Sequence, residues 1–193
     1  MRFRILTICT GNICRSPLAQ LLLEEGLQGV PIDIQSAGTH ALVGHPMPTS
    51  QLLIAQKLGL KSAVEHSARQ LTSAHLESVD LVLALSREHR SAAVQMNPTT
   101  LRRAFTLREL ARIIQVVPDT ELPALSATNV VEKLRHAVDT AASYRGIALP
   151  PEDREDDDVV DPYRRSQGTY DESCDQVVDA VEVLIGYLKR SMG

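Results

Sequence analysis

The sequence predicts an α/β fold in which a parallel β-sheet is covered by helices on both faces. Short apolar runs alternate with segments of helical periodicity, and the first apolar run leads directly into a helical segment. Gly29 and Gly59 each follow a predicted helix, where glycine commonly ends one. A chain of 193 residues is long enough to bury a sizeable core, so we predict a single domain over residues 1–193.

The elements follow from this alternation. The predicted strands are short apolar runs at residues 4–8, 32–35 and 80–85, with a brief one at 103–105. The predicted helices cover residues 17–28, 50–58, 87–95 and 107–114. A C-terminal helix is the clearest, because Val177, Val181, Leu184 and Leu188 recur at helical spacing. Ligands of open α/β sheets bind at the carboxyl ends of the strands, so the loop after the first strand is the expected place for a site.

That loop has the residues of an anion-binding loop. It reads Cys-Thr-Gly-Asn-Ile-Cys-Arg-Ser-Pro from Cys9 to Pro17, and five residues separate Cys9 from Arg15. This length suits a loop that curls around one tetrahedral oxyanion, with backbone N–H groups pointing inward and a guanidinium closing the ring. We expect Gly11 to relieve steric obstruction at the turn, and Ser16 and Pro17 to be the N-cap and the first residue of the helix.

Cys9 is the candidate nucleophile. A helix N-terminus offers free amide donors and a positive dipole, which favour a bound anion and the thiolate form of Cys9. Nucleophile, anion cradle and bidentate phosphate ligand therefore fall in one short segment, which indicates phosphoryl chemistry. A zinc half-site of Cys9 and Cys14 fits less well, because the third cysteine is Cys174 and no His pair stands at finger spacing. A Walker A loop would need a second glycine followed by Lys.

The composition bounds the class of protein. Hydrophobic residues make up 44% and charged residues 23%, which is ordinary for a soluble globular protein. The net charge of −4 gives no reason to expect nucleic-acid binding. No apolar run approaches the roughly 18 residues that span a bilayer. Three cysteines, an odd number, argue against a secreted disulfide scaffold. We therefore expect a cytoplasmic protein without nucleic-acid or membrane partners.

Residues 115–160 differ from the rest of the chain. Four prolines interrupt this stretch, and one amphipathic segment at 129–144 shows helical spacing. Residues 152–158 then hold six acids around one arginine. Such a charge run is typically a solvated loop.

Taken together, the loop and several later motifs resemble the low-molecular-weight protein tyrosine phosphatase family. After the Cys9 signature come Ser-Ala-Gly-Thr at 36–39, His-Ser-Ala-Arg-Gln at 66–70, the strand at 80–83 and Asp-Pro-Tyr at 161–163. The resemblance covers residues 1 to about 111 and about 159 to 190. It implies a flavodoxin-like three-layer fold with a four-stranded parallel sheet. It also implies a phosphomonoesterase that needs no metal or cofactor and acts through a phosphocysteine intermediate.

Between Leu110 and Asp161 lie some fifty residues where the family usually needs far fewer. Residues 115–160 therefore read as a helical insertion. Its helix could pack on the parent fold, cover the cleft as a lid or bind a partner, and packing on the parent fold is the default expectation.

The resemblance assigns roles to single residues. Cys9 attacks phosphorus, and Asp161 protonates the leaving tyrosyl oxygen and then activates the hydrolytic water. The residues expected to bind the phosphate are Thr10, Gly11, Asn12, Ile13, Cys14, Arg15 and Ser16.

Supporting residues are expected around these. The side chains of Asn12, Ser36 and His66 match family positions that hold the loop in shape by hydrogen bonds, and the Ser16 hydroxyl matches the donor to the thiolate. Cys14 is expected either to form a reversible disulfide with Cys9 or to pack in the core. The remaining histidines are expected to be surface or loop residues: His40, His45, His75, His89 and His136.

Substrate choice depends on the cleft walls, for which Ile13, Leu42 and Tyr163 are the candidates. Family members resembling arginine phosphatases carry Thr where this chain has Ile13, so phosphotyrosine is favoured over phosphoarginine. The expected partner is a phosphotyrosine-containing protein, for which a tyrosine kinase is a candidate. A thiol-dependent arsenate reductase would need two further cysteines after the third strand, and residues 83–95 hold none. A non-catalytic phosphate-binding module would normally lack the nucleophile or the acid.

Overall fold

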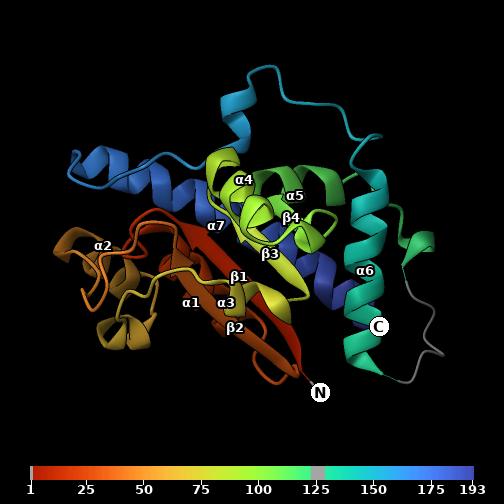
Figure 1. The fold of residues 1–193 in the computed structure, drawn as a ribbon, viewed down its shortest axis with the longest axis horizontal. Helices are drawn as coiled ribbons and strands as arrows, with labels where there is room; N and C mark the ends of the chain where they lie inside the picture. The colour runs from red at the N-terminus through yellow and green to blue at the C-terminus, as the bar shows by residue number, and fades with distance from the viewer. Residues whose placement is uncertain (1, 123–128) are drawn as a thin grey trace.

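The computed structural model describes residues 2–122 and 129–193 (Figure 1). The strands are β1 (Phe3–Cys9), β2 (Ile32–Gly38), β3 (Leu81–Ala84) and β4 (Ala104–Thr106). The helices are α1 (Arg15–Gly26), α2 (Thr49–Lys57), α3 (Ser73–Glu77), α4 (Arg87–Met96), α5 (Leu107–Ile114), α6 (Val130–Tyr144) and α7 (Gln167–Met192). Short 3₁₀ helices lie at Lys61–Glu65, Pro98–Thr100, Asp119–Glu121 and Arg154–Asp157.

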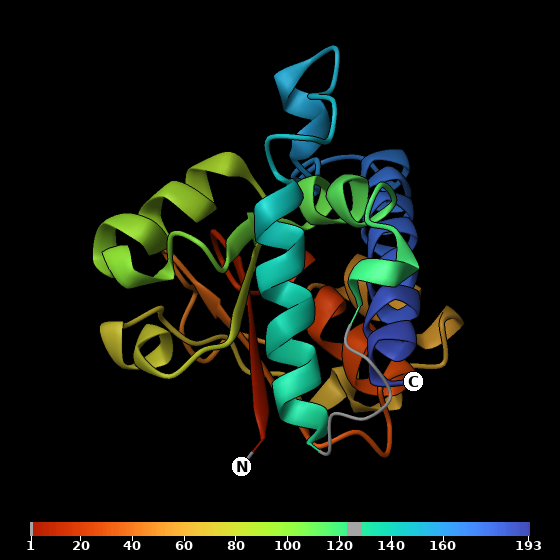
Figure 2. The ribbon, with the colours of Figure 1, turned by 90° about the vertical axis from the view of Figure 1, so that its right-hand side faces the viewer.

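The strands form one parallel sheet in the order β2-β1-β3-β4. Alternate side chains of β1 enter opposite cores: Ile5 joins the cluster under α1, α5, α6 and α7, and Leu6 joins the cluster under α3 and α4. Figure 2 shows this three-layer arrangement, with α3 and α4 on one side of the sheet and α7 on the other. The predicted three-layer fold and its four-stranded parallel sheet are confirmed.

Helix α1 begins two residues earlier than predicted, and α7 extends further towards the N-terminus than the residues that predicted it. Helix α1 begins at Arg15, and its N-cap Cys14 makes no side-chain capping bond. Ser16 and Pro17 are therefore inside the first turn, and the expectation that Ser16 is the N-cap is wrong. Helix α7 begins at Gln167, ten residues before the first apolar residue that predicted it.

Helix α6, in the segment expected to be an insertion, packs on the rest of the fold. Its buried face contacts α5 and α7, and the Tyr187 hydroxyl donates to the Ala137 carbonyl at 2.8 Å. Just beyond α6, Arg145 pairs with Glu109 at 2.9 Å and donates to the carbonyl oxygen of Ala104 in the edge strand β4 at 2.8 Å. These contacts fasten α6 alongside the sheet (Figure 2).

Among the helices described, none combines the length and the apolar character needed to cross a membrane.

Candidate active site

A cavity of about 220 Å³ opens at the carboxyl end of β1. It draws residues from three parts of the chain: the loop after β1, the loop after β2 and the segment before α7. Its lining consists of Cys9, Thr10, Gly11, Ile13, Cys14, Arg15, His40, Leu42, Asp161 and Tyr163. This is the edge at which open α/β sheets bind ligands, and no described residue of 115–160 lines the cavity.

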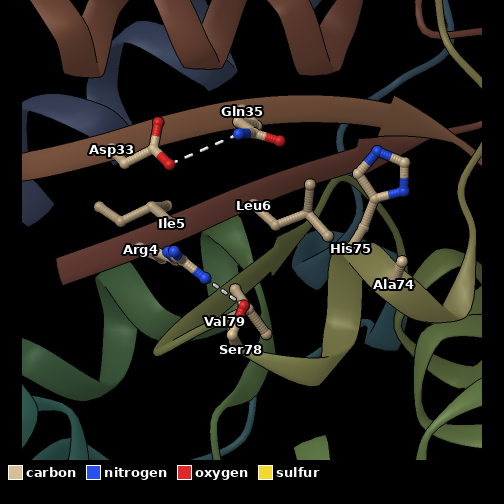
Figure 3. Close-up of a pocket in the computed structure, with 9 residues that line it drawn as sticks. All are labelled: Arg4, Ile5, Leu6, Asp33, Gln35, Ala74, His75, Ser78 and Val79. Atoms are coloured by element: carbon tan, nitrogen blue, oxygen red, sulfur yellow. Dashed lines mark hydrogen bonds between the residues drawn. The ribbon is translucent and has the colours of Figure 1, made fainter. Parts of the chain in front are cut away.

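A second cavity of about 280 Å³ lies elsewhere, over the first half of β1 and beside α3 (Figure 3). Arg4 donates to the Ser78 hydroxyl there, and Gln35 Nε2 donates to Asp33 at 3.4 Å. None of the residues predicted from the sequence to form the site lines this cavity. We therefore take the cavity at Cys9 as the candidate active site.

The backbone from Cys9 to Arg15, which we call the anion loop, offers unused donors. The N–H groups of Gly11, Ile13 and Cys14 have no acceptor in the described part of the chain. The left-handed residue of the loop is Asn12, with φ of 54°, rather than Gly11. A Cβ built on Gly11 would meet the Ile13 side chain at 3.4 Å and Leu42 Cγ at 4.0 Å, which are ordinary contacts. Asn12 thus makes the turn that was expected of Gly11, because Asn tolerates this conformation.

Two donors approach the Cys9 sulfur. The Asn12 backbone N–H lies 3.3 Å from Sγ, and the Ser16 hydroxyl oxygen lies 3.0 Å from it. Since Ser16 Oγ accepts from Asn12 Nδ2 at 3.0 Å, the hydroxyl hydrogen remains for the sulfur. Both contacts stabilise a thiolate, because hydrogen bonds to an ionised acceptor are strong.

Asn12 is in turn held from a distant segment. His66 Nε2 donates to the Asn12 carbonyl at 2.6 Å, and the Arg69 N–H donates to Asn12 Oδ1 at 2.9 Å. Burial lowers the pKa of His66, against the opposing effect of its bond to the Asn12 carbonyl. A neutral His66 therefore supplies one N–H to the loop, and a relay of bonds runs from residues 66–69 to the Cys9 sulfur.

Ser36 does not join this relay. Its side chain is fully buried, and its hydroxyl has no hydrogen-bond partner within residues 2–122 and 129–193. The expectation that Ser36 holds the loop by a hydrogen bond is therefore not met. Thr7, next to it in the β1–β2 register, donates instead to the Ser16 carbonyl at 2.8 Å. The signal for Thr7 in the sequence was a hydroxyl residue among the apolar residues Ile5, Leu6 and Ile8.

Gly38 has a role that sequence reasoning missed. A Cβ at this position would lie 2.4 Å from the Thr10 carbonyl oxygen and 3.0 Å from Ala41. The chain after Gly38 runs against the anion loop, where the Thr39 N–H donates to the Cys9 carbonyl at 2.9 Å. Only glycine permits this close approach of two backbones.

His89 was expected to be a surface or loop residue and is instead buried at 3% exposure. Its Nε2 lies 2.8 Å from Thr10 Oγ1 in the anion loop, and its Nδ1 lies 2.8 Å from Ser86 Oγ at the start of α4. Burial and, to a lesser extent, the positive charge of Arg15 lower the pKa of His89 to about 4. His89 is thus a neutral support for the loop.

Arg15 connects the anion loop with Asp161, the candidate general acid. Its side chain is 6% exposed, and its Nη2 lies 2.8 Å from Asp161 Oδ2. Its Nη1 donates to the Val159 carbonyl at 3.1 Å. The other Asp161 oxygen accepts from the Tyr163 N–H at 3.2 Å, which closes a short turn around Pro162. Two guanidinium N–H groups are thereby engaged, and the remaining three have no partner among the described residues, so they can bind an anion.

Cys14 and Cys174 differ from Cys9 in their surroundings. Burial raises the pKa of Cys14 to about 12, and the neighbouring Cys9 adds to this effect while a hydrogen bond from Tyr170 opposes it. Burial also raises the pKa of Cys174, inside α7, to about 11. Both are held as thiols, and the disulfide between Cys9 and Cys14 stays a prediction.

The three predicted wall residues all line the cavity. Ile13 is buried at 5% exposure and Tyr163 is 37% exposed, while the Leu42 N–H donates to the Gly11 carbonyl at 3.0 Å. The guanidinium of Arg164 lies 5.1 Å from the centre of the Tyr163 ring. The mouth is therefore apolar with a cation at one edge.

Comparisons with known proteins agree with this geometry. The family described as "Low molecular weight phosphotyrosine protein phosphatase" matches residues 4–115. The low molecular weight protein-tyrosine-phosphatase Etp of Escherichia coli (strain K12) is 40% identical over 94 residues, 49% of this chain and 62% of that protein. The chain thus spans about 62% of the length of that relative. A protein-arginine-phosphatase of Geobacillus stearothermophilus is 36% identical over 110 residues, 56% of this chain and 72% of that protein.

Among solved structures, Vibrio vulnificus Wzb in complex with benzylphosphonate has a TM-score of 0.67 at 20% identity, covering 96% of this chain and 99% of that one. At this identity the likeness shows the fold alone. The family match covers more than half of the chain and contains the whole anion loop. The chain therefore belongs to the low molecular weight phosphotyrosine protein phosphatase family.

Proposed function

We propose that this protein hydrolyses phosphotyrosine in protein substrates through a phosphocysteine intermediate. The observation that carries the proposal is the juxtaposition at the cavity. The Cys9 sulfur there has two hydrogen-bond donors, and Arg15 pairs with Asp161 beside it. Nucleophile, anion ligand and acid thus share one small space.

In the first step the Cys9 thiolate attacks phosphorus in line with the tyrosyl oxygen. The S–P bond forms as the P–O bond breaks, and Asp161 gives its proton to the departing phenol oxygen. Arg15 and the free N–H groups of the anion loop bind the three non-bridging oxygens as their charge redistributes.

In the second step water attacks the phosphocysteine. Asp161, now ionised, takes a proton from the water as the new P–O bond forms and the P–S bond breaks. The sulfur leaves as a thiolate, which the Ser16 hydroxyl stabilises from 3.0 Å. Inorganic phosphate then leaves the loop.

The test is hydrolysis of an aryl phosphate by the intact protein and by Cys9→Ser. Cys9→Ser should lower kcat by at least about a thousandfold, because removing a nucleophile removes the reaction path. Vanadate should inhibit the intact protein. An intact protein that binds vanadate without turnover would instead be a phosphate-binding module.

The cavity walls favour a phenyl ring over a guanidine. Ile13 and Leu42 are apolar, and Tyr163 can stack on an aromatic substrate. Phosphoarginine is the second candidate substrate, because the Geobacillus relative is a protein-arginine-phosphatase. A kinetic panel of phosphotyrosine, phosphoarginine and phosphoserine peptides decides between them. A higher kcat/KM for phosphoarginine would reverse the assignment.

An arsenate reductase is the weakest candidate. Its thiol relay needs two further accessible cysteines, whereas Cys14 and Cys174 are buried with raised pKa values. Thiol-dependent consumption of arsenate would support it nevertheless. A tyrosine kinase as the phosphorylated partner and a cytoplasmic location stay predictions.

We also propose that residues 115–160 are an insertion in one phosphatase domain. The family match ends at residue 115, and α6 packs on α5 and α7. This packing favours a structural insertion over a lid.

A further inference from the structure

The acidic run at residues 152–158 is anchored at its end rather than free in solvent. Asp158 accepts from the backbone N–H of Arg87 at 2.6 Å, and from the Arg87 Nε and Nη2 at 3.1 and 3.0 Å. Asp157 accepts from Arg112 Nη2 at 3.1 and 3.0 Å. Two arginines, one from α4 and one from α5, therefore hold its last two carboxylates.

The backbone beyond these carboxylates is held as closely. Arg108 Nη1 donates to the Asp158 carbonyl at 2.8 Å. Val159 is buried at 2% exposure, and its N–H donates to the Leu85 carbonyl, at the end of β3, at 2.9 Å. Its own carbonyl accepts from Arg15. The segment is thus fixed to the sheet, to α5 and to the anion loop.

Asp161 follows this fixed segment at once. It stands three residues after Asp158, and three residues of extended chain span at most about 11 Å. The intervening Val160 N–H is itself bonded to Gln176 Oε1 at 2.9 Å. The position of Asp158 therefore limits where the Asp161 carboxylate can lie.

The same turn of α4 also contacts the anion loop. Arg87 donates to the Asp158 carboxylate, and Nε2 of His89, two residues later, lies 2.8 Å from Thr10 Oγ1. Ser86 caps this turn and accepts from the His89 N–H. The first turn of α4 is therefore bonded both to Asp158, which precedes Asp161, and to the anion loop.

We propose that Arg87 and Arg112 are positioning residues for Asp161, which set its carboxylate against the substrate oxygen by holding Asp158 and Asp157. This inference rests on the proposed function, because it concerns the proton that Asp161 delivers. The set that we call the acid-loop anchor consists of Arg87, Arg108, Arg112, Asp157 and Asp158. On this proposal, the end of the 115–160 segment serves to place the general acid.

The form of the contacts supports positioning rather than stability alone. An isolated ion pair near the surface stabilises a fold little. Two-pronged contacts between guanidinium and carboxylate fix orientation as well as distance. Both pairs of the anchor have this form, since each guanidinium reaches both oxygens of its carboxylate.

The test is the double variant Arg87→Gln with Arg112→Gln, assayed on two substrates. We expect kcat/KM for phosphotyrosine to fall at least about tenfold, because a misplaced acid no longer protonates a poor leaving group. The kcat/KM for 2,4-dinitrophenyl phosphate should stay within about twofold, since its leaving group departs without a proton. Thermal unfolding of each variant is recorded alongside.

Arg154→Gln is the matched control, because Arg154 is exposed in the same acidic run and pairs with no acid among the described residues. Arg154→Gln should leave kcat/KM unchanged for both substrates. Equal losses on both substrates in the double variant, or no loss on either, would overturn the role of the anchor. An intact protein that hydrolyses neither substrate would overturn the proposed function itself, and this inference with it.

Where the double variant lacks a cooperative unfolding transition, Arg87→Lys and Arg112→Lys replace it. Lysine keeps the charge and loses the two-pronged contact. We expect kcat/KM for phosphotyrosine to fall about threefold in this variant, while kcat/KM for 2,4-dinitrophenyl phosphate stays unchanged. The absence of this difference would contradict the proposal.

Discussion

At the scale of single residues, two donors contact the Cys9 sulfur, one from the backbone and one from a side chain. Asn12 supplies its backbone N–H and positions Ser16, and Ser16 supplies its hydroxyl. His66 and Arg69 contact the anion loop through Asn12, so their effect on the sulfur is indirect. In the proposed mechanism, the Ser16 hydroxyl bond to the sulfur strengthens as the thiolate leaves phosphorus.

Ser16→Ala should therefore slow the breakdown of the phosphocysteine. We expect kcat to fall about tenfold or more, with accumulation of the intermediate as a burst of phenol in stopped-flow measurements. Ser36→Ala is the matched control, because Ser36 is equally buried and its hydroxyl has no partner in the described part of the chain. A similar loss of kcat in both variants would contradict the role of Ser16.

His89 predicts a pH dependence of stability. Its pKa is about 4 in the folded protein and about 6.5 in an unfolded chain. Between these values the unfolded state binds more protons, so stability falls as the pH drops from about 6.5 towards 4.

His89→Asn removes this linkage. Between pH 7 and 4.5, the intact protein should lose roughly 2 kcal/mol more of its unfolding free energy than the variant. Urea unfolding at both pH values measures the difference. Parallel losses in the two proteins would mean that His89 is protonated while folded.

At the scale of elements, the close approach between the end of β2 and the anion loop fixes one wall of the site. The Gly38 N–H donates to the Arg69 carbonyl at 2.9 Å, and its carbonyl accepts from Leu71 at 2.7 Å. The wall and the loop are thus tied to residues 69–71, which also support Asn12. A displacement of one would move the others.

Gly38→Ala should disturb this arrangement, since the new Cβ would lie 2.4 Å from the Thr10 carbonyl oxygen. We expect a fall in kcat/KM of about a hundredfold, because the anion loop must shift to relieve the clash. Gly146→Ala is the control, as its Cβ would meet nothing within 4 Å. Full activity of Gly38→Ala would show that the loop tolerates the shift.

Local patterns predicted most elements, for a physical reason. The period of apolar residues distinguishes strand from helix over a few residues, and this held for β1, β3 and α5. The start of α1 was misplaced because Ser and Pro are good starting residues by local preference. In the fold, the Ser16 hydroxyl bonds to a sulfur from β1 instead.

At the scale of the whole molecule, residues from opposite ends of the chain complete the site. Asp161 reaches Arg15 because the segment before α7 crosses the carboxyl edge of the sheet. In this pair the carboxylate occupies one guanidinium N–H group. Asp161 therefore competes with a bound anion for the charge of Arg15.

Asp161→Asn should have opposite effects on binding and turnover. Vanadate should bind about two- to fivefold tighter, because a negative charge beside Arg15 is lost. The kcat for phosphotyrosine should fall about a hundredfold or more, because no acid remains. Asp156→Asn makes the same change on an exposed residue outside the cavity and should alter neither value. Weaker vanadate binding by Asp161→Asn would contradict the competition.

The sequence by itself determined the strands of the sheet, most of the helices and the members of the anion loop, because these depend on residues close together in the chain. Only the tertiary structure decided the partners of Asp157, Asp158 and His89, which lie 45, 71 and 79 residues away. Nothing in the local pattern of an acidic run shows whether it meets arginines or water. Folding brings the carboxyl ends of four parallel strands to one edge of the sheet. Charged residues that are distant in the sequence meet near this edge and form pairs there.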